Sequence, residues 1–95
     1  MKIKEGFILR EVAGSFIVVA VGDAVKTYNG IIKLNETSAF LWNKLVKGAT
    51  EEELVDALLD EYEVEKEVAV KGVQSFINRL VEAKLVIYPK GFTME

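Results

Sequence analysis

The chain has 95 residues, a formal net charge of −3 and 51% apolar residues, a composition typical of one globular domain, which we expect to span residues 1–95. It contains no cysteine and no histidine, which excludes disulfides, thiolate metal sites and the usual nucleophile–base pairs of enzymes. No apolar run has the length of a signal peptide or of a membrane span, so we expect a cytoplasmic protein without a membrane partner.

Residues 7–21 are rich in β-branched and aromatic side chains and predict a hairpin. The segments FILREV (Phe7–Val12) and SFIVVAV (Ser15–Val21) flank Ala13-Gly14, a pair of the kind that tight hairpin turns use. The next segment, GDAVKTYNG, ends at Asn29-Gly30, which is a strong turn signal. Its AVKTY portion suits a strand and an ordered loop equally well.

The sequence IIKL (Ile31–Leu34) is typical of a short strand, which Asn35 ends. From Asn35 onward, apolar residues recur about every three and a half residues instead of every second residue. Asn35, or alternatively Thr37, is a suitable cap for a first helix over residues 36–47, and Gly48 ends this helix. We expect Trp42, on the apolar face of this helix, to anchor the core.

Two more helices and a final strand follow. Thr50 and Glu53 form a capping box for a second helix that runs to about Tyr62. The third helix begins near Glu65, and Leu85–Tyr88 have the character of a short last strand. This order predicts an α+β fold of the winged helix-turn-helix class. It consists of an N-terminal three-stranded antiparallel β unit followed by three helices and a short C-terminal strand.

The inventory of side chains argues against catalysis. The serines have no neighbouring base, and neither a glycine-rich phosphate loop nor a calcium-loop spacing occurs. The carboxylates of the second helix fall on its water-facing side, where a solvated surface explains them. We therefore expect a protein that is not an enzyme and that binds no cofactor and no metal.

The distribution of charge bears on nucleic acid binding. Residues 1–34 carry five basic and three acidic side chains, whereas residues 35–95 carry seven basic and twelve acidic ones. The third helix balances three of each, so it lacks the excess of Lys and Arg that phosphate contacts require. We expect no nucleic acid partner. The fold also suits two other functions, which we keep as alternatives to the peptide-binding function described next. These are a winged-helix nucleic-acid-binding transcriptional regulator and a structural interaction or dimerisation domain.

Much of the chain resembles a known family. The stretch GIIKLNETSAFLW, followed by LVKGATEEELVDALLDEYEVEKEVAVKGVQSFINRLVEAKLV, resembles the PqqD-like family, named for pyrroloquinoline quinone biosynthesis protein D and also called RiPP recognition elements. The resemblance runs from the hairpin LREVAGSFIVVAVG to Leu85, and LNETSAFLW is its most specific part. It implies an adaptor that binds the leader segment of a ribosomally made precursor peptide and presents the peptide to a modifying enzyme, often a radical S-adenosylmethionine (SAM) enzyme. In that family the leader adds as a strand to the third β-strand and lies against the third helix.

The corresponding residues of this chain lie in two segments. Ile31–Leu34 fits an edge strand whose unpaired backbone groups a peptide can join, with Lys33 as its only charge. An edge of this kind also allows a homodimer. The expected peptide-binding residues are Tyr28, Asn29, Gly30, Ile31, Ile32, Lys33 and Leu34 around the strand, and Val70, Gln74 and Ile77 on the third helix.

Several of these residues have a second interpretation. Because strand faces alternate, we expect one of Ile31 and Ile32 to pack into the core. Lys33 serves either to protect the edge against aggregation or to contact an acidic leader. Residues 28–30 are turn residues first, and a role at the rim of the binding pocket is their alternative.

Overall fold

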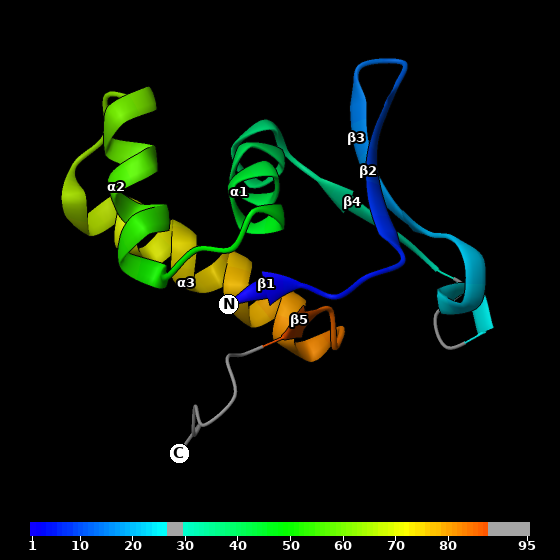
Figure 1. Ribbon diagram of the computed structural model, residues 1–95. Helices are drawn as coiled ribbons and strands as arrows, with labels where there is room; N and C mark the ends of the chain where they lie inside the picture. The colour runs from blue at the N-terminus through cyan, green and yellow to red at the C-terminus, as the bar shows by residue number, and fades with distance from the viewer. Residues whose placement is uncertain (27–29, 88–95) are drawn as a thin grey trace.

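A computed structural model of the chain describes residues 1–26 and 30–87. In Figure 1 the helices lie together on one side, and a three-stranded sheet extends from them next to the first helix. Three residues named above, Tyr28 and Asn29 before the edge strand and Tyr88 in the expected last strand, lie outside the described residues.

The sheet confirms the predicted three-stranded unit and the α+β fold. Its strands are β2 (Phe7–Val12), β3 (Ser15–Ala20) and β4 (Ile31–Leu34), in the order β2-β3-β4, and both pairings are antiparallel. β3 ends one residue before the predicted Val21. The sheet therefore has β4 at one edge and β2 at the other.

The turn between β2 and β3 suggests a stabilising substitution. Ala13 and Gly14 both have positive φ, 51° and 79°, and turns of this type favour Asn-Gly because alanine is strained there. We expect Ala13→Asn to raise the free energy of unfolding by about 0.5–1 kcal/mol, measured by urea denaturation. Gly14→Ala should lower the same free energy, because alanine is strained at the positive φ of this position. The added methyl group itself has room, since apart from its chain neighbours no described residue has a heavy atom within 4 Å of it. A lower stability for Ala13→Asn would contradict this account of the turn.

The segment for which the sequence left strand and loop open is partly helical. Residues Gly22–Lys26 form a 3-10 helix, η1, which includes the first three residues of AVKTY. The last two residues, 27 and 28, lie outside the described part of the chain.

All three predicted helices are present, with the bounds α1 (Glu36–Val46), α2 (Glu51–Glu61) and α3 (Lys66–Glu82). Asn35 caps α1, because its side-chain oxygen accepts a hydrogen bond from the Ser38 N–H at 2.8 Å. Thr50 and Glu53 form the predicted capping box of α2, with bonds of 2.8 and 3.1 Å. Gly48 follows α1 with φ of +90°, as expected of a residue that ends a helix.

The first residues form a strand that the sequence did not predict. β1 (Lys2–Ile3) pairs antiparallel with β5 (Val86–Ile87), which lies within the predicted last strand. Next to this pair, the Lys4 N–H donates to the Leu85 carbonyl at 2.7 Å. The Met1 ammonium group donates to the Ala49 carbonyl at 2.9 Å. These bonds tie the N-terminal segment to both the end of α3 and the α1–α2 connection.

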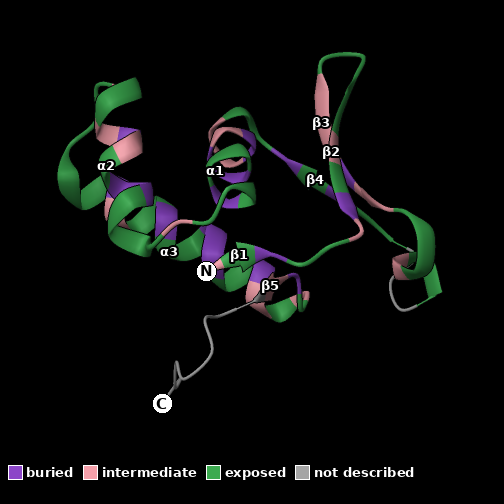
Figure 2. Ribbon diagram, in the orientation of Figure 1, coloured by how far each residue is buried: buried purple, intermediate pink, exposed green. Residues whose placement is uncertain are grey.

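One hydrophobic core joins the sheet to the helices, and Figure 2 shows that the buried residues line the surfaces where these elements meet. Trp42 of α1 is 1% exposed, which agrees with its expected role as a core anchor. The sheet contributes from one face only, through buried residues such as Val18, Ile32 and Leu34. β4 is therefore held in place by its inward side chains as well as by its pairing with β3.

Within the described residues, no helix combines the length and the apolar character needed to cross a membrane.

Candidate functional site

β4 forms an open edge of the three-stranded sheet. It pairs with β3 on one side, and no other strand of the described residues pairs with its second side. Figure 1 shows β4 between β3 and the helices, leading directly into α1. This arrangement agrees with the prediction of an edge strand at residues 31–34.

The strand register identifies which backbone groups of β3 face β4. Opposite residues of antiparallel strands alternate between hydrogen-bonded and non-hydrogen-bonded pairs. Val12 and Ser15 flank a two-residue turn, so they form a hydrogen-bonded pair. The Val21 N–H, which donates to the Gly6 carbonyl at 2.7 Å, continues the same alternation. The odd-numbered residues of β3 therefore bond to β2, and the even-numbered ones bond to β4.

On β4, the partners of these even-numbered residues are Ile32 and Leu34, which lie opposite Val18 and Phe16. Their N–H and C=O groups therefore point toward β3. The N–H and C=O groups of Ile31 and Lys33 point the other way, to the free edge. β4 thus offers two donors and two acceptors to an added strand.

The side chains of β4 divide between core and solvent. Ile32 and Leu34 are 6% and 4% exposed, so they belong to the core. Ile31 is 66% exposed and Lys33 is also exposed, on the outer face of the sheet. This confirms that one of Ile31 and Ile32 packs inward. The role of Ile32 and Leu34 is to hold the strand, while Ile31 and Lys33 present its free backbone groups.

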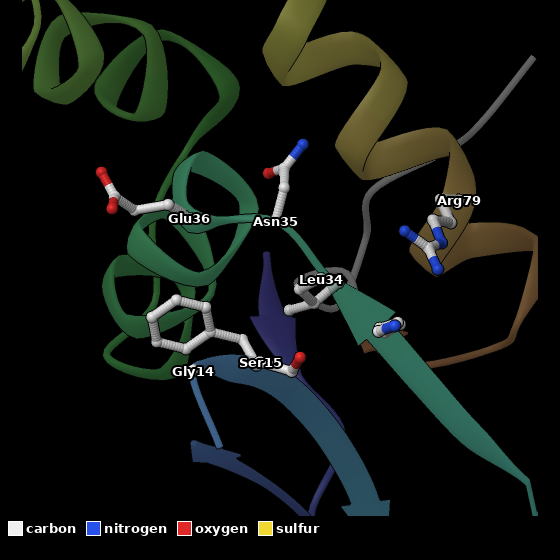
Figure 3. A pocket seen from close by; sticks show the side chains of 8 residues that line it. Gly14, Ser15, Leu34, Asn35, Glu36 and Arg79 are labelled. Atoms are coloured by element: carbon white, nitrogen blue, oxygen red, sulfur yellow. The ribbon is translucent and has the colours of Figure 1, made fainter. Parts of the chain in front are cut away.

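A cavity of about 510 Å³ lies where β4 passes into α1. Figure 3 shows that Arg79 reaches toward β4 from α3, on the side opposite Ser15 of β3. Arg79 was not among the residues expected from the sequence. The lining residues are Gly14, Ser15, Phe16, Lys33, Leu34, Asn35, Glu36 and Arg79.

A second cavity, of about 480 Å³, continues along α3 from Arg79. It is lined by Lys71, Gln74, Ser75, Asn78, Arg79 and Glu82. Arg79 lines both cavities, so the two adjoin at this side chain, one at the end of β4 and the other along the exposed face of α3. We call the two cavities together the β4–α3 groove. Gln74, one of the expected residues, lies on it.

The other two expected residues of α3 lie elsewhere. Ile77 is 6% exposed and is part of the core. Val70 is half-buried and lines a cavity with Val55 and neighbouring residues of α2. At about 100° per residue, Val70 and Arg79 point from opposite sides of α3. The structure therefore does not bring Val70 and Ile77 to the β4–α3 groove.

The groove holds two positive charges without partners. Within the described residues, the ion pairs are Lys26–Asp23 at 3.9 Å and Lys71–Glu67 at 3.7 Å, so neither Lys33 nor Arg79 is paired. Glu36 is the one carboxylate among the residues that line the first cavity. The cavity at the end of β4 therefore has one net positive charge, although the chain as a whole is acidic, and Glu82 lines the second cavity.

Comparison of the sequence with models of protein families identifies the family of this chain. The model described as Coenzyme PQQ synthesis protein D (PqqD) matches residues 7–86, which include the sheet, all three helices and both cavities. The chain belongs to the PqqD family. No curated protein matches it.

Two solved structures share the fold of this PqqD-family chain. The structure titled "TbiB1 in Complex with the TbiA(beta) Leader Peptide" matches with a TM-score of 0.73 and 20% identity, over 99% of this chain and all of that chain. The structure titled "Lasso peptide synthetase B1 complexed with the leader peptide" matches with a TM-score of 0.71 and 18% identity, over 92% and 96% of the two chains. Both of those proteins were solved with a leader peptide bound.

Proposed function

We propose that this PqqD-family protein is a cytoplasmic adaptor that binds the leader segment of a ribosomally made precursor peptide. The leader adds as a strand to the free edge of β4, and the adaptor presents the rest of the precursor to a modifying enzyme of the radical SAM class. The observation that carries this proposal is the free edge itself, with the N–H and C=O groups of Ile31 and Lys33 directed away from β3. The family match and the two leader-peptide complexes of the same fold support it.

Backbone pairing alone is too weak for useful affinity. Four backbone hydrogen bonds contribute a net ~0.5–1.5 kcal/mol each, and the cost of ordering the peptide reduces this gain further. Micromolar affinity corresponds to about 8 kcal/mol. Side chains of the leader must supply the difference, and the β4–α3 groove lies beside the strand for them to enter.

The proposed contacts follow from the position of each residue. Ile31 and Lys33 bind the leader backbone, and Ile32 and Leu34 keep β4 in register with β3. Gln74 and Arg79 form the wall of the groove on α3. Gly30 is exposed and directly precedes β4, and residues 28 and 29, which come before it in the sequence, complete the proposed set.

Of the two edges of the sheet, β4 has outward backbone groups at Ile31 and Lys33 and borders the β4–α3 groove. β2 forms the other edge and pairs with no further strand of the described residues, and it contributes no residue to the two cavities that form the β4–α3 groove. Strand addition with side-chain recognition needs both features. This difference makes the β2 edge a built-in control for experiments on β4.

Amide-shift mapping tests the proposal. We expect synthetic leader segments of short precursor-like peptides encoded beside this gene to shift the amide signals of residues 30–35 and of the C-terminal half of α3. The reason is that an added strand changes the hydrogen bonding of β4 and fills the groove. Shifts confined to α2 or to the β1–β5 pair would contradict the proposed site. Co-purification of a co-encoded radical SAM enzyme with the loaded adaptor tests the choice of enzyme.

A further inference from the structure

The two unpaired cations of the groove come from two different elements. Lys33 lies on β4 and Arg79 lies on α3, and both line the cavity at the end of β4. In the described chain neither has an acidic partner. Glu36, which lines the same cavity, leaves an excess of one positive charge there. A free positive charge next to a peptide-binding edge is a means of selecting the peptide by charge.

The geometry of strand addition brings an added strand close to both cations. The residue opposite Lys33 points to the outer face of the sheet, where cross-strand side chains lie about 4.5–5.5 Å apart at Cβ. The residue next to it points inward, because successive residues of a strand alternate. The inward side faces α3, from which Arg79 reaches toward β4 (Figure 3). An acidic side chain at this level of the added strand therefore lies beside Lys33 if it points outward and faces the helix that carries Arg79 if it points inward.

We infer that the segment bound on β4 carries an Asp or Glu side chain at the level of Lys33 and Leu34, and that Lys33 and Arg79 recognise its carboxylate. This inference rests on the proposed strand addition and goes beyond it by naming the chemistry of the bound peptide. It also gives Lys33 one of the two roles that the sequence left open, that of a contact for an acidic leader.

The position of Arg79 in the fold does not by itself require this orientation. Arg79 lies in the last turn of α3, where a positive charge is favoured by the helix dipole. The dipole acts on a side chain that points into solvent as well as on one that points to β4. Charge recognition thus explains the orientation of Arg79 toward β4, whereas the helix dipole explains its place in the last turn. Measuring the stability of the variants as well as their binding separates these two roles.

A peptide selection tests the inference without knowledge of the natural leader. Random 12-residue peptides displayed on mRNA are selected on the wild-type protein, on the double variant Lys33→Gln/Arg79→Gln, and on Lys4→Gln/Lys47→Gln. The last variant removes the same charge from exposed residues that do not line the groove. Urea denaturation of all three proteins checks that the groove variant is folded.

We expect the wild type and the charge-matched control to enrich peptides with Asp or Glu at one or two fixed positions, and the groove variant to enrich peptides without them. In a selected peptide, Glu→Gln should weaken binding to the wild type by roughly three- to tenfold and leave binding to the groove variant unchanged. Salt should weaken the wild-type complex more than the complex of the groove variant.

Failure of the charge recognition and failure of the strand addition would give different results. Selected peptides that protect the β4 amides from hydrogen exchange but show no acidic position would overturn the charge recognition and leave strand addition intact. A selection that returns no binder, or binders that leave the β4 amides unprotected, would overturn strand addition and the charge recognition with it.

Discussion

Lys33→Pro is expected to weaken peptide binding by at least about tenfold while the protein remains folded. The Lys33 N–H points to the free edge, so proline removes a donor that only an added strand uses. The variant loses one hydrogen bond and leaves a carbonyl of the peptide without a partner, which together cost about 1–3 kcal/mol. It also loses the charge of the Lys33 side chain, and the sum corresponds to at least about tenfold in affinity. Proline is tolerated on edge strands whose N–H faces solvent, so the pairing of β4 with β3 should persist.

The matched control is Glu11→Pro on the opposite edge. Glu11 lies opposite Phe16 in a pair that is not hydrogen-bonded, so its N–H also points away from the sheet. Lys33→Ala is the second control, because it removes the side chain and keeps the N–H. Affinities are measured by fluorescence anisotropy with the peptides from the display selection, and unfolding is followed by circular dichroism.

We expect full affinity for Glu11→Pro, a loss of at least tenfold for Lys33→Pro, and an intermediate loss for Lys33→Ala. Equal weakening by the two proline variants would show that neither edge is specific. Unchanged binding by Lys33→Pro would exclude β4 as the strand that pairs with the peptide.

Most of the secondary structure was predictable because its signals are local. The Thr50–Glu53 capping box and the Asn35 cap are encoded within four residues each, and both are present as hydrogen bonds of 2.8–3.1 Å. Ile31–Leu34 was predictable as a strand for the same reason. β1 was not predictable, because two residues carry no periodic pattern and Lys2 pairs with Ile87 at the far end of the sequence.

The candidate site was predictable in part. The sequence located the strand, since a short apolar strand before a capped helix is a local pattern. On α3 it named Gln74, which lines the β4–α3 groove, but it did not name Arg79. Helical periodicity identifies the buried stripe, to which Ile77 belongs, but does not say which neighbour lies on each side of that stripe. The tertiary packing places α2 beside Val70 and β4 beside Arg79.

Trp42→Ala is expected to have the largest effect on stability. Trp42 is 1% exposed, on the helix that follows β4, and it belongs to the core cluster that also includes Ile32 and Leu34. Truncation of a buried aromatic residue costs about 3–5 kcal/mol, of a total that is roughly 5–15 kcal/mol for a domain of this size. The melting temperature should fall by about 15–30 °C.

Val46→Ala is the matched control on the same helix, since Val46 is 47% exposed and should change the free energy of unfolding by less than about 0.5 kcal/mol. Circular dichroism is the suitable measurement, because Trp42 is the only tryptophan and its removal abolishes the tryptophan fluorescence. A loss below about 1 kcal/mol for Trp42→Ala would contradict its role as the core anchor.

Below the melting temperature of Trp42→Ala, the free edge of β4 is still present in every folded molecule. The variant should therefore bind selected peptides more tightly than Lys33→Pro does, although Lys33→Pro is the more stable protein.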